Sequence, residues 1–109
     1  MAVHEFAMMP QEPQKGVRFD EYEPQKYACI SVPDEAVESI LQGLNGVEFY
    51  HHAVDEPKKG LAYCGITLIP PASARKFIEV IGDSVELANL KALLETALMF
   101  DKWIIHFGI

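Results

Sequence analysis

The chain has 109 residues, of which 50% are hydrophobic and 10% aromatic, enough for one domain with one buried core. Its 9 basic and 16 acidic residues give a net charge of −7. This balance argues against binding to nucleic acids and to anionic membrane surfaces, because both attract basic proteins.

Two cysteines, Cys29 and Cys64, are too few for a zinc finger or a framework of disulfides. The N-terminus lacks the basic start and long apolar run of a secretory signal. No apolar stretch approaches the roughly 18 residues of a membrane-spanning helix. We therefore expect a protein of the reducing cytoplasm that does not enter membranes.

Residues 1–26 carry the weakest structural pattern, because prolines interrupt them repeatedly. Val17 and Phe19 alternate with charged residues, which indicates a short extended piece. We interpret residues 1–26 as an N-terminal arm with room for one edge strand, and residues 27–109 as a single domain.

The domain is predicted to begin with a strand at Tyr27–Val32, which is rich in β-branched and aromatic residues and stops at Pro33. Asp34 then suits a helix start, because its carboxylate can accept hydrogen bonds from free amide groups. The helix is indicated by apolar residues at i, i+3, i+4 and i+7, namely Val37, Ile40, Leu41 and Leu44.

Two further strands are predicted at Val47–Val54 and Leu61–Ile69, joined by the polar turn Asp55–Gly60. They form a hairpin in which we pair Val54 with Leu61. This register places His52 across from Tyr63, and a slip of one residue would undo the pairing.

The last third of the chain predicts two helices and a strand. After Pro70-Pro71 the first helix has its own apolar stripe, and Gly82 ends it. Asp83 and Glu86 have the spacing of a capping box for a second, leucine-rich helix that ends near Phe100. Lys102–Phe107 is the final strand.

This order of strands and helices matches the split βαβ pattern of ferredoxin-like domains. The predicted fold class is α+β, ferredoxin-like βαββ(αα)β, plus the N-terminal arm. Its four-stranded antiparallel sheet would carry the helices on one face, and its strands would lie in the order fourth, first, third, second.

Alternation along the strands then separates two faces of the sheet. We assign the more apolar set of each strand, including Ile66, Leu68, Ile105 and Phe107, to the helices. The opposite face would be open and would carry a mixed aromatic and polar set: Tyr27, Cys29, Tyr50, His52, Tyr63, Ile104 and His106. A second subunit, the arm or a ligand should cover it.

This open face holds the candidate chemical groups. His52 and His106 are candidate general bases, and Tyr50 and Tyr63 are candidates for orienting a substrate. Cys29, His52 and His106 have ligand types that zinc or copper accepts, but they lack the close spacing of structural zinc sites. We expect no metal and no cofactor, and we find no nucleophile motif and no glycine-rich phosphate loop.

We therefore expect a binding or interaction module, rather than an enzyme, that uses the open sheet face for self-association or partner capture. A homodimer, a basic protein partner and a small hydrophobic ligand all fit this expectation. The alternative is a small-molecule enzyme of the dimeric α/β-barrel type, with a histidine base on the sheet face; only the order of elements resembles that type.

Overall fold

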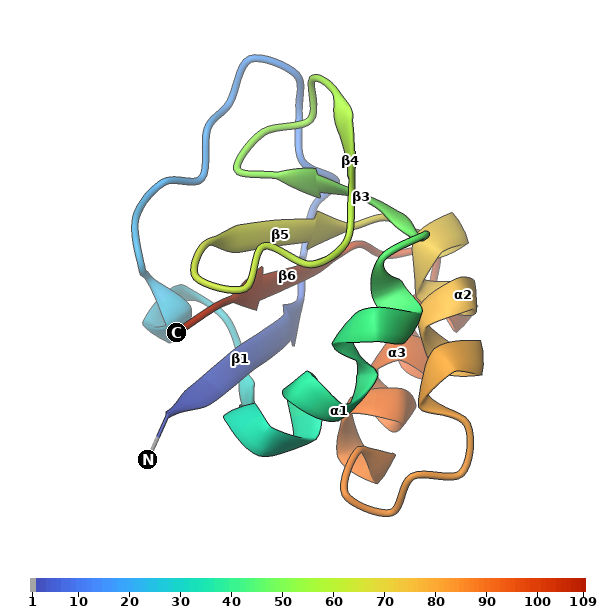
Figure 1. The fold of residues 1–109 in the computed structure, drawn as a ribbon. Coiled ribbons are helices and arrows are strands. Elements are labelled where there is room, and N and C mark those ends of the chain that lie inside the picture. The colour runs from blue at the N-terminus through green and yellow to red at the C-terminus, as the bar shows by residue number, and fades with distance from the viewer. Residues whose placement is uncertain (1) are drawn as a thin grey trace.

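The computed structural model describes residues 2–109 and has a small α+β fold (Figure 1). Its elements in chain order are β1 (Val3–Met8), the 3-10 helix η1 (Pro24–Lys26), β2 (Ile30–Pro33), α1 (Asp34–Leu44), β3 (Glu48–His51), β4 (Pro57–Lys59), β5 (Ile66–Ile69), α2 (Pro71–Ile81), α3 (Ala88–Met99) and β6 (Ile104–Phe107).

The sheet has six antiparallel strands in the order β2-β1-β6-β5-β3-β4. The prediction of a four-stranded ferredoxin-like arrangement is therefore wrong. In the ferredoxin-like arrangement, β2 would lie between β6 and β5. In this structure β1 lies between β2 and β6 instead. Phe6 of β1 is therefore paired with Ile30 on one side and with His106 on the other. β2 is displaced to one edge, and β4 forms the other.

β1 is an interior strand, whereas the sequence left room only for an edge strand in residues 1–26. Both of its faces are covered, since His4 and Phe6 are buried beneath the helices and Ala7 is buried on the opposite side. A strand buried on both faces has no alternation of polar and apolar residues, and this removes the period-two pattern by which strands are recognised.

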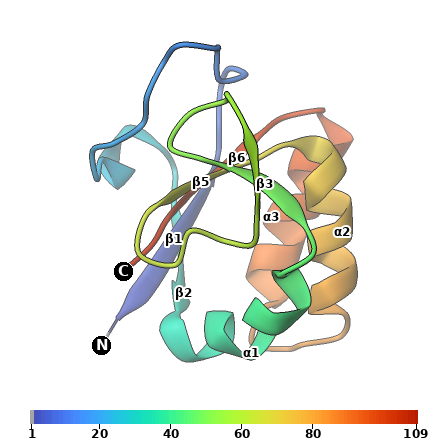
Figure 2. The ribbon, with the colours of Figure 1, turned by 45° about the horizontal axis from the view of Figure 1, so that its top comes forward.

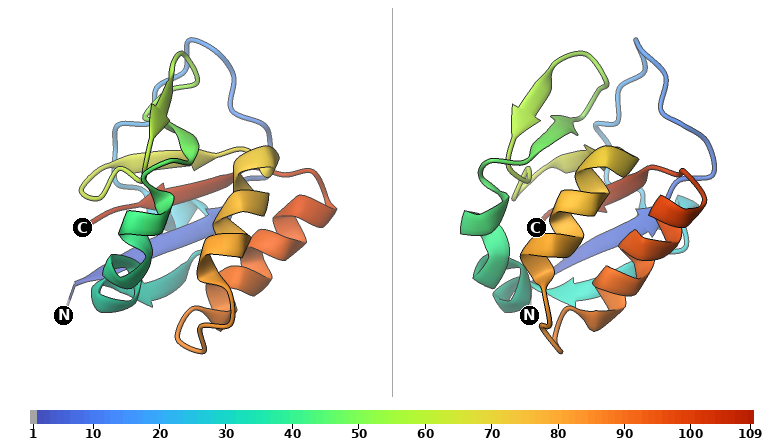
Figure 3. Two further views of the ribbon diagram at one scale, coloured as in Figure 1. Left: turned by 45° about the vertical axis from the view of Figure 1, so that its right-hand side comes forward. Right: turned by 90° about the vertical axis from the view of Figure 1, so that its right-hand side faces the viewer.

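The α-helices α1, α2 and α3 all cover one face of the sheet, with α2 and α3 side by side (Figure 3). The predicted helices at 34–44 and 71–81 are confirmed. The predicted capping box at Asp83 is wrong, because α3 begins at Ala88 and has no side-chain cap. The core on this face includes Phe6, Val32, Val37, Leu44, Phe49, Ile69, Phe77, Leu90, Leu94 and Ile104.

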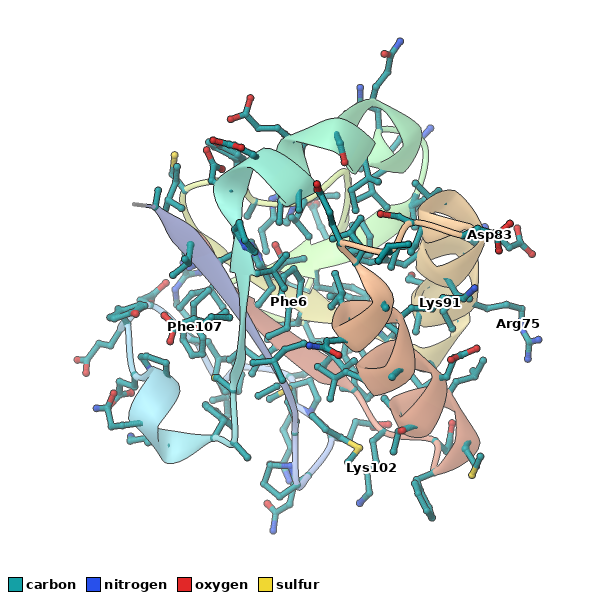
Figure 4. The ribbon with its side chains drawn as sticks, turned by 90° about the horizontal axis from the view of Figure 1, so that it is seen from below. Phe6, Arg75, Asp83, Lys91, Lys102 and Phe107 are labelled. Carbon is teal, nitrogen blue, oxygen red and sulfur yellow. The ribbon has the colours of Figure 1, made fainter. Side chains whose placement is uncertain are left out.

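Residues 10–29 run across the other face of the sheet (Figure 2). We call them the arm. Phe19, Tyr27 and Cys29 of the arm pack on a second buried cluster that contains Ala7, Met9, Ile66, Leu68, Ile105 and Phe107. Figure 4 shows the two layers from below: Phe6 points toward the helices, and Phe107 points toward η1.

The predicted hairpin register is also wrong. Tyr50 is paired with Leu68, a shift of three residues from the register that pairs Val54 with Leu61. The shift arises because Pro57–Lys59 is not a turn; it forms β4, which pairs with the far edge of β3. An odd shift exchanges the two faces of β5, so Thr67 and Ile69 face the helices in place of Ile66 and Leu68.

The assignment of faces in β6 is wrong as well, because Ile104 and His106 lie on the helix side, and Ile105 and Phe107 on the arm side. All four residues are buried, so apolar character could not distinguish the two faces. Among residues 2–109, no helix has both the length and the apolar character to cross a membrane.

Candidate functional site

A cavity of about 480 Å³ opens between the arm and the end of the sheet. We call it the end pocket. Val3, Ile66 and Phe107 give it an apolar floor, and its remaining lining consists of Ala2, Asp20, Tyr22, His52, Cys64, Gly65, Gly108 and Ile109. Its volume lies in the range of small-molecule sites in proteins.

His52 lines the end pocket from a strained backbone position. It follows the last residue of β3 with a φ of 64°, and the amide of Ala53 donates to the carbonyl of His51 across it at 2.7 Å. A three-residue turn with a positive φ at its centre is rare for a residue with a side chain. Such strain persists only where the surroundings hold the residue firmly.

The arm and β5 supply these restraints. The amide of His52 donates to the carbonyl of Ile66 at 3.0 Å, and its carbonyl accepts from the amide of Phe19 at 2.7 Å. Its Nδ1 lies 3.0 Å from the Phe19 carbonyl and 3.3 Å from a carboxylate oxygen of Asp20. A carbonyl oxygen can only accept a hydrogen bond, so Nδ1 of His52 carries a proton.

Gly65 allows the imidazole to lie against the pocket wall. A Cβ at this position would come within 2.8 Å of Nε2 of His52. Any larger residue would therefore move the ring.

One acidic residue, Asp20, lines the end pocket, and a second, Glu5, is bound to the lining residue Tyr22. Arg18 donates two hydrogen bonds to Asp20, at 2.7 and 3.0 Å, and these hold the pKa of that carboxyl below its usual value. Tyr22 donates from its hydroxyl to the carboxylate of Glu5, which raises the pKa of Tyr22. Asp20 is thus kept ionised, and a fixed donor orients each of the two carboxylates.

The two cysteines are free and lie in different surroundings. Cys64 is exposed and lines the end pocket. Cys29 is partly buried against the sheet, with its Sγ 3.5 Å from the carbonyl of Pro24, and burial raises the pKa of its thiol. Cys64 is therefore the more accessible of the two thiols, and it lines the end pocket.

A chain of hydrogen-bonded polar groups, three of them buried, lies behind the pocket on the helix side of the sheet. We call it the polar circuit; its members are Thr67, His106, His4, Asp34 and Tyr63. The distances are 3.1 Å from Thr67 Oγ1 to His106 Nδ1, 2.8 Å from His106 Nε2 to His4 Nδ1, and 2.9 Å from His4 Nε2 to Asp34 Oδ1. The Tyr63 hydroxyl donates to the same Asp34 oxygen.

One direction of hydrogen bonding satisfies the whole polar circuit. Thr67 Oγ1 accepts from the amide of Ala62 at 2.8 Å, so its hydroxyl donates to His106. His106 then donates to His4, and His4 donates to the Asp34 carboxylate. Within residues 2–109, no buried side-chain nitrogen or oxygen lacks a partner. One proton on each imidazole is therefore enough to satisfy every contact of the polar circuit.

The environment of the polar circuit shifts the pKa values of its members. Burial, helped by His4 and His51, lowers the pKa of His106 to about 3. Hydrogen bonds from Tyr63 and His4 lower the pKa of Asp34, which lies in the first turn of α1, where the helix dipole also favours a negative charge. The same hydrogen bond raises the pKa of Tyr63 well above its usual range. A shared hydrogen bond with Asp34 raises the pKa of Glu38.

The seven residues predicted for the open face are divided between these places. Tyr27, Cys29, Tyr50 and His52 lie on the arm side, where Tyr50 packs against Trp103 with ring centroids 5.7 Å apart. Ile104 and His106 lie on the helix side, and Tyr63 reaches Asp34 there. The structure brings together only part of the set.

The low-ranked metal set of Cys29, His52 and His106 is divided between the two faces in the same way. Cys29 contacts Pro24, His52 contacts the arm backbone, and His106 contacts His4 and Thr67. Over the described residues 2–109, no three His, Cys, Asp or Glu side chains are grouped so that they could hold a metal ion.

Sequence reasoning missed several residues of both sites: Glu5, Asp20, Tyr22, His4, Asp34 and Thr67. His4 and Asp34 belong together only because β1 joins the sheet, and no local pattern shows this pairing. Asp34 was expected to cap α1, but its carboxylate makes no cap and accepts from His4 and Tyr63.

Comparison with family models, with curated proteins and with solved structures found no match to this chain. The candidate sites therefore depend on their geometry alone.

Proposed function

We propose that this protein is a binding module that holds a small molecule with an apolar body and a positively charged group in the end pocket. The observation that carries the proposal is the pocket itself: a cavity of about 480 Å³ lined by apolar side chains such as Val3, Ile66 and Phe107 and by the polar residues Asp20, Tyr22 and His52. Small-molecule sites combine these two features, with few polar groups that fix the ligand's orientation.

The charged residues near the end pocket indicate which ligand charge it should favour. Asp20 lines the pocket, and Tyr22, another lining residue, donates to the carboxylate of Glu5. Asp34 and Glu35 line a smaller neighbouring cavity that shares Ala2 with the end pocket. Arg18, the one basic partner in these contacts, is already paired with Asp20. The resulting negative potential favours a cation.

Self-association through the open face has less support. The arm packs on that face, so a partner would have to displace Phe19 and Tyr27 first. The expected homodimer stays a prediction, and so does the basic protein partner. The free, unpaired cysteines agree with the expected cytoplasmic location.

Three matched probes test the proposal: phenethylamine, 2-phenylethanol and 3-phenylpropionate, which share a phenyl group and differ in charge. Isothermal titration calorimetry should show the order cation, neutral, anion, with the cation at least about tenfold tighter than the anion, a difference of roughly 1.4 kcal/mol. Asp20→Asn should reduce that ratio, because it removes the charge of Asp20.

A pocket-filling variant supplies the control. Val3→Trp places an indole on the floor of the end pocket and should abolish binding of phenethylamine. Val17→Trp is the matched control, because Val17 is a similarly exposed valine of the arm that does not line this pocket. Equal binding of all three probes, or binding that survives Val3→Trp, would overturn the proposal.

A second candidate function is thiol-based acyl transfer, and the shared lining of His52 and Cys64 favours it. In residues 2–109 no hydrogen bond joins the two side chains, so a substrate would have to draw them together. The thiolate would attack an ester carbonyl, release the alcohol and leave an acyl-enzyme that water hydrolyses. With p-nitrophenyl acetate, a burst lost in Cys64→Ser and kept in Cys29→Ser would support this function; no burst would exclude it.

A further inference from the structure

The polar circuit begins and ends on neighbouring residues of one loop. The amide of Ala62 donates to Thr67 at one end, and the hydroxyl of Tyr63 donates to Asp34 at the other. The two ends of the polar circuit are therefore joined covalently, because Ala62 and Tyr63 are consecutive residues. Between these two ends lie the two buried imidazoles, which are 0% exposed.

The same loop forms a wall of the end pocket. We call residues 62–65 the wall segment, because Cys64 and Gly65 line the pocket. The segment is also bound to the chain after β6: the amide of Gly108 donates to Gly65 at 2.7 Å, and the amide of Ile109 donates to Tyr63 at 3.1 Å. The positions of these pocket residues thus depend on the bonds that hold Ala62 and Tyr63.

The polar circuit has no place for an additional proton. A proton added to His106 would make both of its nitrogens donors, so Thr67 would have to accept from His106 instead of donating to it. The hydroxyl hydrogen of Thr67 would then lose its acceptor. A positive charge would also be placed on a side chain that is 0% exposed, and this is costly.

Polar and titratable groups from α1, β3, β5 and the wall segment lie near the imidazoles of His4 and His106. Asp34 and Glu38 come from α1, Tyr63 from the wall segment, Thr67 from β5 and His51 from β3. Of these, only Asp34 offers a direct negative contact, to His4. His106 has none, and burial lowers its pKa to about 3.

Proton linkage gives the direction of the effect. A hydrated imidazole has a pKa near 6.5, so a state in which the wall segment has opened binds more protons than the closed state. Lowering the pH below about 6.5 therefore favours opening, and raising the pH favours closure.

We propose that the polar circuit is an acid-sensitive latch on the wall of the end pocket, closed at neutral pH and released as the pH falls. Opening of the wall follows from the circuit alone. Its consequence, loss of a bound ligand in acid, rests on the function proposed above.

Hydrogen exchange measured by mass spectrometry tests the latch without any ligand. Between about pH 7.5 and about pH 5, and after correction for intrinsic exchange rates, a peptide covering residues 61–66 should lose protection by about tenfold or more. A peptide from α3 should stay better protected than residues 61–66 at every pH in this range, because its amides open only when the whole fold does. Equal protection of the two peptides at about pH 5 would mean that the wall opens only by global unfolding, and constant protection of residues 61–66 would mean no latch; either result overturns the proposal.

Tyr63→Phe removes one end of the circuit without burying a new group. It should lower the protection of residues 61–66 already at neutral pH and leave a smaller further change in acid. Tyr27→Phe, a matched change in the arm, should behave as the unmodified protein. If Tyr63→Phe keeps the full pH response, the circuit does not hold the wall.

Phenethylamine binding over the same pH range separates the two proposals. If the wall segment opens in acid but phenethylamine does not bind even at neutral pH, the latch is retained and the proposed function of the pocket is rejected. Binding that stays constant while the wall opens would retain the pocket and reject its regulation.

Discussion

Thr67 illustrates how much a single buried hydroxyl can control. Its Oγ1 accepts from the amide of Ala62, and its hydrogen goes to His106, while the residue itself is 0% exposed. Thr67→Val keeps the shape but leaves an amide and an imidazole nitrogen without partners. We expect a loss of about 2 kcal/mol in the free energy of unfolding, because an unsatisfied buried group carries its full desolvation cost. Urea unfolding followed by Trp103 fluorescence measures it.

Thr96→Val is the matched control. Thr96 is exposed on α3, and its hydroxyl donates only to the carbonyl of Ala92, four residues earlier in the same helix. Its replacement should change the free energy of unfolding by less than about 0.5 kcal/mol. Equal losses in the two variants would show that the hydroxyl of Thr67 has no special role.

At the scale of elements, the sequence predicts helices better than strands in this protein. α1 and α2 follow from apolar stripes that contain Val37, Ile40, Phe77 and Ile81, and these residues are buried as expected. A helix covering one face of a sheet keeps a polar side toward water, so its periodicity survives in the sequence.

The strands lose their signal because the sheet is covered on both faces. β5 and β6 are buried at every position, and β1 is buried on both of its faces. Pro57 and Lys58, which read as a polar turn, form an edge strand instead, and edge strands commonly carry lysine and proline. The sheet order and the hairpin register therefore could not be obtained from periodicity.

The contact between the end of β6 and the wall segment yields the prediction at this scale. A Cβ on Gly108 would lie 2.1 Å from the carbonyl oxygen of Tyr63, where no side chain fits. Gly108→Ala should push the two segments apart and cost about 3 kcal/mol in the free energy of unfolding. The circular dichroism melting temperature should fall accordingly.

Gly46→Ala tests whether the cost is local. A Cβ at Gly46 meets nothing within 4 Å, so the added methyl should be neutral or slightly stabilising. A melting temperature of Gly108→Ala as high as that of Gly46→Ala would mean that the two segments are not in contact in solution.

At the scale of the whole molecule, the chain forms three layers: the helices, the sheet and the arm (Figure 2). This layering explains which part of the candidate site could be predicted. His52 was identified by its residue type and its place on the arm-side face, and the end pocket contains it. Its partners Phe19 and Asp20 come from the arm, and no sequence pattern indicates where an irregular segment will dock.

The stability of the whole molecule should depend on pH through its buried histidine. His106 has a pKa of about 3 in the folded chain and near 6.5 when unfolded, so the unfolded state binds more protons in acid. Its contribution is therefore complete above about pH 6.5 and is lost as the pH falls, by about 1.4 kcal/mol for each unit. Asp34, whose pKa is lowered, also loses its contribution in acid, but only at a lower pH.

Urea titrations between about pH 7.5 and about pH 4.5 should therefore show a fall of roughly 2 to 3 kcal/mol in the free energy of unfolding. His106→Gln, which is neutral at every pH, should flatten the profile even if it lowers the stability throughout. His52→Gln, which changes a partly exposed histidine of the end pocket, should leave the slope unchanged. Because the polar circuit joins β1, β5, β6, α1 and the wall segment, a flat profile in the unmodified protein would argue against the buried, neutral state of His106 on which this reasoning depends.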